Sequence, residues 1–159
     1  MNNITKFVAI STLALFVACA NQSASQVAQD VANIAGGVAA AAQTLRDANL
    51  LTTDQQVKLD DAVSALQAAA LAVARATNNA DQQNATKEVV VAFNAVVAVL
   101  ANDKNLPQNV TTVLTAAEVL LPTVEALVGL PVTSTATAVA MTPDEANAVL
   151  ATEAASVHP

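Results

Sequence analysis

The residues of this chain best able to perform specific chemistry are a single cysteine and a single histidine. Cys19 ends a run of apolar residues near the N-terminus, and His158 is the penultimate residue. A chain terminus does not hold a side chain within the roughly 0.5 Å that a working catalytic or metal site requires. One cysteine and one histidine also fall short of the clustered ligands of a zinc site. Cys19 is therefore the residue whose surroundings matter most.

The segment before Cys19 has the parts of an export signal. A short charged start that contains Lys6 is followed by the apolar run of residues 7–18 and then by the cysteine. A helix needs about 20 apolar residues to cross a bilayer, and this run is shorter than that. A single cysteine also excludes a disulfide within one chain. The leader therefore predicts export.

The sequence Phe16-Val17-Ala18-Cys19 resembles the lipobox of bacterial lipoproteins. In that family the signal peptide is removed before the cysteine, which becomes the diacylated N-terminal residue. The family prefers leucine at the position that Phe16 occupies here. The resemblance implies lipidation of Cys19 and attachment to a membrane. Two other outcomes stay open: ordinary cleavage after Ala20, because Ala18-Cys19-Ala20 also has a small-x-small form, and an uncleaved anchor.

Composition restricts the partners of the mature chain. The 159 residues carry a net charge of −7 at pH 7, and loss of Lys6 with the leader makes the remainder more acidic. Nucleic acids and anionic surfaces bind basic faces, so no nucleic acid is expected as a partner. Phe93 is the single aromatic residue after the leader. The mature chain therefore has no platform on which bases could stack.

The sequence offers no catalytic arrangement. Its three glycines do not form a phosphate-binding loop, and no base accompanies the serines to activate them. Glu118 and Glu125 lie seven residues apart, about two turns along one helical face. We expect these carboxylates to form a solvated edge rather than a catalytic pair. The prediction is a protein that is not an enzyme, with no metal site and no cofactor.

Apolar residues recur every three or four positions in four long segments, which predicts four amphipathic helices. Their expected ranges are about 25–49, 53–77, 81–101 and 107–129. The β-branched run of residues 89–100 has the length and the 89-93-96-100 spacing of a buried helix rather than a strand. In the fourth segment, Leu120 and Leu127 widen the apolar stripe. Because the connections are short, neighbouring helices should be antiparallel.

Several positions predict how these helices begin, end and pack. Thr52 or Thr53 can cap the second helix. We interpret Gly36-Gly37, inside the first helix, as close contact with a neighbouring helix or a kink rather than a hinge. Pro122 should kink or split the fourth helix, and Gly129 should end it.

The C-terminal region should form a short extra helix. Thr142-Pro143-Asp144-Glu145 supplies a cap, a proline at the first helical position and acids in the first turn, which predicts a helix over about 143–156. Val149 and Leu150 are its apolar anchor, and it either docks on the bundle or folds on a partner. The fold class is therefore all-α: an antiparallel bundle of about four amphipathic helices, with this short helix after it and a signal helix before it. The expected organisation is a signal peptide at 1–18, the lipidated cysteine and a tether at 19–26, the bundle at 27–130, a linker at 131–141 and the short helix at 142–159.

These features predict a lipid-anchored bacterial cell-envelope protein with a structural or protein-interaction role. The residue after Cys19 is Ala20 rather than Asp, which by the same resemblance favours the outer membrane in a cell with two membranes. The expected partners are the membrane, through the lipid on Cys19, and a second copy of the chain or another envelope protein. Without lipidation the protein would be periplasmic or secreted.

Two alternative functions remain open at this point. The mean hydropathy of +0.47 is high, and apolar surface left over from the core would suit a bundle that binds an apolar ligand or lipid. The alanine-rich stripes would also suit an alanine-zipper-like oligomer, similar to the major outer-membrane lipoprotein. In composition the chain is similar in style to small alanine-rich lipoproteins of prophage regions.

Overall fold

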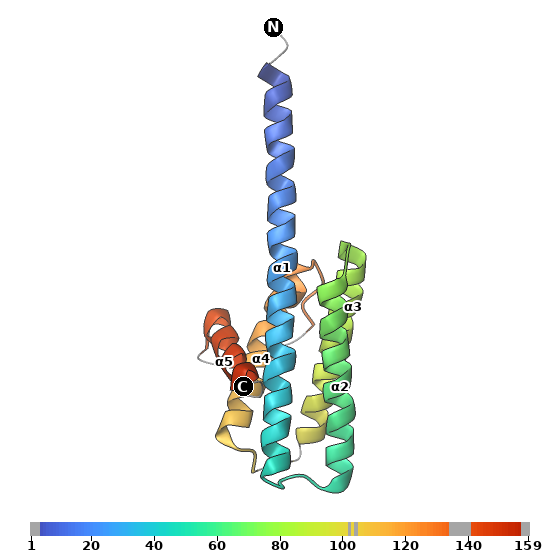
Figure 1. Ribbon diagram of the computed structural model, residues 1–159, viewed down its shortest axis with the longest axis vertical. Helices are drawn as coiled ribbons and strands as arrows, with labels where there is room; N and C mark the ends of the chain where they lie inside the picture. The colour runs from blue at the N-terminus through green and yellow to red at the C-terminus, as the bar shows by residue number, and fades with distance from the viewer. Residues whose placement is uncertain (1–3, 102, 104, 134–140, 157–159) are drawn as a thin grey trace.

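The structure is a computed structural model that describes residues 4–101, 103, 105–133 and 141–156, with side chains described from Ala24 onwards. Throughout these ranges the regular secondary structure is α-helical, as Figure 1 shows. The helices are α1 (Ile4–Asp47), α2 (Thr53–Arg75), α3 (Asn79–Leu100), α4 (Gln108–Leu127) and α5 (Pro143–Ser156). The predicted all-α class, with four long helices and a short C-terminal one, is confirmed.

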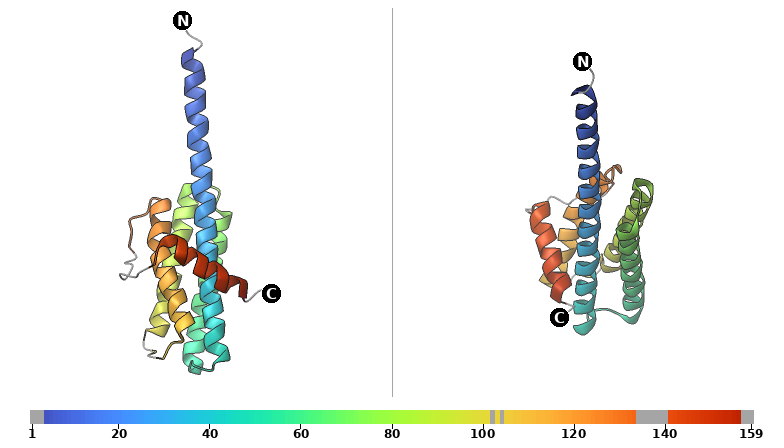
Figure 2. Two further views of the ribbon diagram at one scale, coloured as in Figure 1. Left: turned by 90° about the vertical axis from the view of Figure 1, so that its left-hand side faces the viewer. Right: turned by 45° about the horizontal axis from the view of Figure 1, so that its top comes forward.

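Four long helices form a bundle, and α5 lies against one side of it (Figures 1 and 2). The helix α2 packs on both α1 and α3, whereas α4 packs on α1 and makes fewer contacts with α3. The helix α5 packs on α1 and α4. Since α2, α4 and α5 all contact α1, this helix is the central support of the fold.

The helix α1 is 44 residues long and runs without a break from the leader into the bundle. Its N-terminal part extends beyond the other helices (Figure 1). Residues 20–26, expected to be a tether, have a helical backbone in this full-length chain. Neither glycine nor proline interrupts that segment, and alanine and glutamine favour helix, so the helix of the leader continues into the first helix of the bundle.

The predicted caps of α2 and α5 are confirmed, whereas α3 begins at Asn79 with Asn78 as its cap rather than at Asp81. Thr52 caps α2 and forms a capping box with Gln55, whose side chain accepts a hydrogen bond from the Thr52 backbone N–H at 3.0 Å. The same reciprocal pattern links Thr142 and Glu145 at the start of α5. In both cases a side chain satisfies a backbone donor that has no partner within the helix.

The helix α4 ends where predicted but is not split. Gly129 has a φ of +75°, and the Leu130 backbone N–H donates to the Glu125 carbonyl oxygen at 2.9 Å, as in a Schellman motif. Pro122 lies inside α4, which nevertheless continues from Gln108 to Leu127. The packing of α4 against α1 and α5 compensates for the backbone hydrogen bond that the proline removes.

The core consists mainly of alanine, valine and leucine, with Phe93 as its aromatic residue. The predicted stripes of α2 and α3 are buried: Leu59, Val63, Leu66, Ala70 and Val73 on α2, and Val89, Phe93, Val96 and Leu100 on α3. Thr86 on α3 is a polar residue in this core, and within the described part of the chain its buried hydroxyl has no hydrogen-bond partner. Such a hydroxyl costs about 1–3 kcal/mol.

Among the residues with described positions, α4 is the helix whose length and composition would allow it to cross a membrane. One face of α4 is buried in the bundle, where it packs against α1 and α5. The apolar composition of α4 is therefore that of a helix packed in a protein core.

Leu127 departs from the predicted apolar stripe of α4. It was expected on the apolar face and is instead 41% exposed at the end of the helix.

Candidate functional site

Cys19 lies in α1, five residues before Ala24, where the description of side chains begins. Its thiol and the surroundings of that thiol are therefore outside the described residues. The N-terminal part of α1 projects beyond the bundle (Figure 1), and Cys19 precedes the first bundle residue with a described side chain, Ala24. The proposed lipidation site is thus close in sequence to the end of the bundle from which α1 emerges.

Two glutamines hold this end of the bundle together. Gln82 on α3 donates from Nε2 to the carbonyl oxygen of Ala24 on α1 at 3.2 Å. Gln83 donates from Nε2 to the carbonyl oxygen of Val128, just after α4, at 2.8 Å. A cleft of about 650 Å³ lies between these elements, lined by Ala24, Gln82 and residues 76–79 and 126–129. None of the residues that line this cleft is charged.

A buried polar cluster joins α5 to α1. Asp30 on α1 is 2% exposed, and its Oδ1 accepts hydrogen bonds from Gln26 Nε2 at 2.8 Å and from Asn147 Nδ2 at 2.9 Å. Asn33 donates in turn to the side-chain oxygen of Asn147. Burial raises the pKa of Asp30 above its ordinary value; the two amide hydrogen bonds oppose this effect, and the negative charge of Asp144 adds to it. The cluster fixes the position of α5 along α1.

The two glycines of α1 lie directly beneath α5. A Cβ at Gly36 would come within 2.6 Å of the Ala154 Cβ, and a Cβ at Gly37 within 2.7 Å of Leu150 Cδ2. Carbon atoms do not approach so closely, and the Ala154 Cβ cannot move without its backbone, so a side chain at Gly36 would force the two helices apart. A side chain at Gly37 would displace the buried Leu150 side chain and would also lie 3.3 Å from the Leu150 Cα. The predicted close contact with a neighbouring helix is confirmed, and the neighbour is α5.

The polar part of this contact was not predicted from the sequence. Gln26, Asp30, Asn33 and Gly37 recur at intervals of four, three and four, so they form a second stripe beside the apolar one. That spacing is the signal that could have identified a second contact face on α1. The docking of α5 on the bundle decides between the two outcomes that the sequence left open for it.

The expectation of a solvated carboxylate edge on α4 is wrong for Glu125. This side chain is 2% exposed, whereas Glu118 is half-buried. The Thr133 backbone N–H donates to Glu125 Oε2 at 3.1 Å, and the Thr133 hydroxyl donates to Oε1. The chain turns at Gly129 and returns to α4 at Thr133, so Glu125 holds the loop between them in place.

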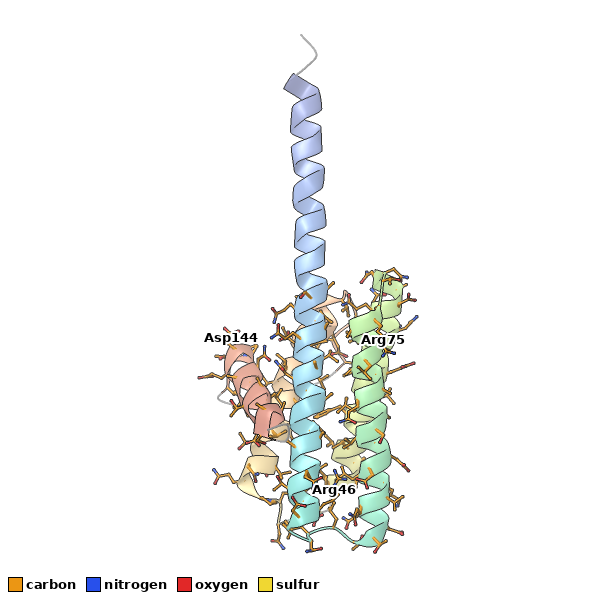
Figure 3. The ribbon with its side chains drawn as sticks, viewed as in Figure 1. Arg46, Arg75 and Asp144 are labelled. Carbon is orange, nitrogen blue, oxygen red and sulfur yellow. The ribbon has the colours of Figure 1, made fainter. Side chains whose placement is uncertain are left out.

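The remaining candidate residues are not brought together within the described part of the chain. His158 lies outside the described residues. Within the ranges that the structure describes, no group of three or more His, Cys, Asp or Glu side chains is placed to hold a metal ion. Arg46 forms an ion pair with Asp60 at 3.2 Å, at the end of the bundle away from the leader (Figure 3). Both side chains are partly exposed, so this pair contributes little to stability.

No protein-family model matches the sequence, and searches of curated proteins and of solved structures found no significant match. Function is therefore inferred from the residues and their positions alone.

Proposed function

We propose that this protein is a lipid-anchored component of a bacterial cell envelope, with a structural or protein-interaction role and without catalysis. The observation that carries the proposal is the lipobox-like sequence of residues 16–19, which lies on the helix that continues into the bundle. The diacylated thiol of Cys19 would be the anchor. The outer membrane is the proposed location in a cell with two membranes, because Ala20 follows the cysteine.

The continuity of α1 supports this proposal on mechanical grounds. Two acyl chains hold a protein stably on a membrane, whereas one chain gives only reversible binding. Ala24 is the fifth residue after Cys19, and a helix rises about 1.5 Å per residue, so the bundle would lie within about 8 Å of its anchor. A bundle held so close to the bilayer suits a role that depends on its location.

The intact mass of the full-length protein, expressed with its leader and extracted from membranes, tests the proposal. We expect a chain that begins at Cys19 and carries the added mass of diacylglycerol. The matched variant Cys19→Ser keeps a small polar side chain but has no thiol to acylate, so it should lack that mass and leave the membrane fraction or remain unprocessed. A wild-type chain that begins at Asn21 without lipid would show that ordinary signal cleavage is correct.

A further inference from the structure

Two apolar side chains are exposed at the end of the bundle from which α1 emerges. Leu127, at the last position of α4, is 41% exposed, and Val132 is 56% exposed. The chain turns at Gly129 and is tied back to Glu125 by Thr133, so residues 130–132 form the tip of a loop. We call the surface made of Ala24, residues 76–79 and residues 126–132 the leader-side end.

The leader-side end differs in charge from the rest of the protein. The whole chain carries a net charge of −7, whereas the cleft in this end has no charged residue in its lining. Arg75 ends α2 and Asp81 lies in the first turn of α3, so these two charges near the surface have opposite signs. The Glu125 side chain, which directly precedes residues 126–132, is 2% exposed and accepts hydrogen bonds from Thr133. Bringing this end against a bilayer, including an anionic one, therefore costs less electrostatic energy than bringing an acidic face there.

The length of helix between Cys19 and the bundle determines how far the leader-side end lies from the hydrocarbon core of the bilayer. Five helical residues span about 7.5 Å, whereas five extended residues would span about 17 Å. The polar layer of one bilayer leaflet is about 5–8 Å thick. With the acyl chains of Cys19 in the hydrocarbon core, a helical connection leaves the leader-side end at the level of the headgroups.

We propose that the leader-side end rests on the lipid surface that holds the anchor, with Leu127 and Val132 inserted among the headgroups. The bundle then stands upright on the membrane, and its opposite end faces away from the bilayer. This inference rests on the proposed lipidation of Cys19, since the lipid on that residue brings the surface to the membrane. The exposed side chains of Thr77 and Asn79, which line the cleft, are available to hydrogen-bond the headgroups.

Site-directed spin labelling of the full-length protein tests the contact. Lipidation blocks the thiol of Cys19, so a nitroxide attaches only to a new cysteine in the variants Leu127→Cys, Val132→Cys and Leu50→Cys. Leu50 is the matched control because it is 40% exposed and follows α1 at the opposite end of the bundle. Each variant is extracted from membranes and reconstituted in vesicles of phosphatidylethanolamine and phosphatidylglycerol. Collision rates with oxygen and with a water-soluble nickel complex are then compared.

We expect a higher ratio of oxygen to nickel collisions at positions 127 and 132 than at position 50, where the label should behave as in water. Equal, water-like ratios at all three positions would overturn the contact, and so would labels shielded from both reagents, which indicate burial against protein. The intact mass of the same samples separates the two proposals. If Cys19 carries lipid but the labels at positions 127 and 132 behave as in water, the proposed anchor stands and the proposed membrane contact is wrong. If Cys19 carries no lipid, both proposals are wrong. Circular dichroism confirms that each variant is folded.

Discussion

The α2–α3 pair and the α1–α5 contact are two helix pairs built in different ways. The facing surfaces of α2 and α3 bury continuous stripes of alanine, valine and leucine, with Phe93 as their largest side chain. The contact of α5 with α1 instead combines a glycine pair, two buried apolar residues of α5 and a buried carboxylate. The first design gains stability from buried apolar area, and the second gains a defined position from shape and hydrogen bonds.

The two pairs also differ in how much of the protein depends on them. The helix α2 connects α1 to α3, so its loss would open the bundle. The helix α5 has 14 residues, buries Ala146 and Leu150, and lies on the outer side of α1 and α4. Helices this short are marginal in isolation. We therefore expect α5 to detach by local unfolding while the four long helices remain folded.

Truncation of one buried leucine in each pair gives the largest expected effect. Leu66→Ala on α2 should lower the free energy of unfolding of the bundle by about 2–5 kcal/mol, and Leu150→Ala should lower that of the local unfolding of α5 by a similar amount. Both side chains are fully buried, so each truncation leaves a cavity. Hydrogen exchange distinguishes the two outcomes. Leu66→Ala should speed the exchange of amides throughout the bundle, whereas Leu150→Ala should speed it in α5 alone. If both variants sped amide exchange equally throughout the bundle, α5 would unfold together with the four long helices rather than by itself.

A methyl group at the glycine pair should have the next largest effect. Gly37→Ala places a Cβ 2.7 Å from Leu150 Cδ2, and overpacking of this kind costs about 1–3 kcal/mol. In an unobstructed helix the same change would stabilise by about 1 kcal/mol. The sign of the change in the free energy of α5 unfolding therefore tests the close contact. The double variant with Leu150→Ala is the control, because removal of the Leu150 methyl groups should recover part of the loss that Gly37→Ala causes.

The difference between the pairs also explains what could be predicted from the sequence. The stripes and the capping boxes at Thr52 and Thr142 are local patterns, each readable within one segment. The partner of Asp30 is Asn147, which is 117 residues away, so no local pattern connects them. The glycine pair predicted a close neighbour but not which helix it was. Glu125 was misjudged because the loop that buries it folds back from Gly129 to Thr133, which a helical periodicity does not reveal.

The proposal of lipidation at Cys19 likewise comes from a local pattern, because the leader and Cys19 form one continuous motif. The leader-side end was not predictable, because it gathers Ala24, residues 76–79 and the end of α4 from three separate segments. Motifs along the chain thus suggest where an anchor would lie. Only the packing of the helices shows which surface that anchor would bring to a membrane.

The smallest expected effect concerns the charge of Asp30, where burial and hydrogen bonding oppose each other. Burial raises the pKa of Asp30 above the ordinary value of 3.8, so the folded protein binds this proton more tightly than the unfolded chain. The contribution of Asp30 to stability is therefore most favourable below pH 3.8, falls as the pH rises to the folded-state value, and is constant above it. Asp144 is the charged group of α5 that faces Asp30 and contributes to this shift.

Asp30→Asn should remove this pH dependence, because the amide oxygen can still accept from Gln26 and Asn147 without carrying a charge. The variant should resist unfolding of α5 better than the wild type at pH 7, and the advantage should disappear as the pH falls toward 3.8. Hydrogen exchange in α5, measured across this range and corrected for the intrinsic exchange rate, checks the result. Asp61→Asn, on the exposed face of α2, is the matched control and should leave the pH profile of α5 unchanged. A lower stability of Asp30→Asn at pH 7 would show that the charge strengthens the contact, and that hydrogen bonding to the carboxylate outweighs the cost of its burial.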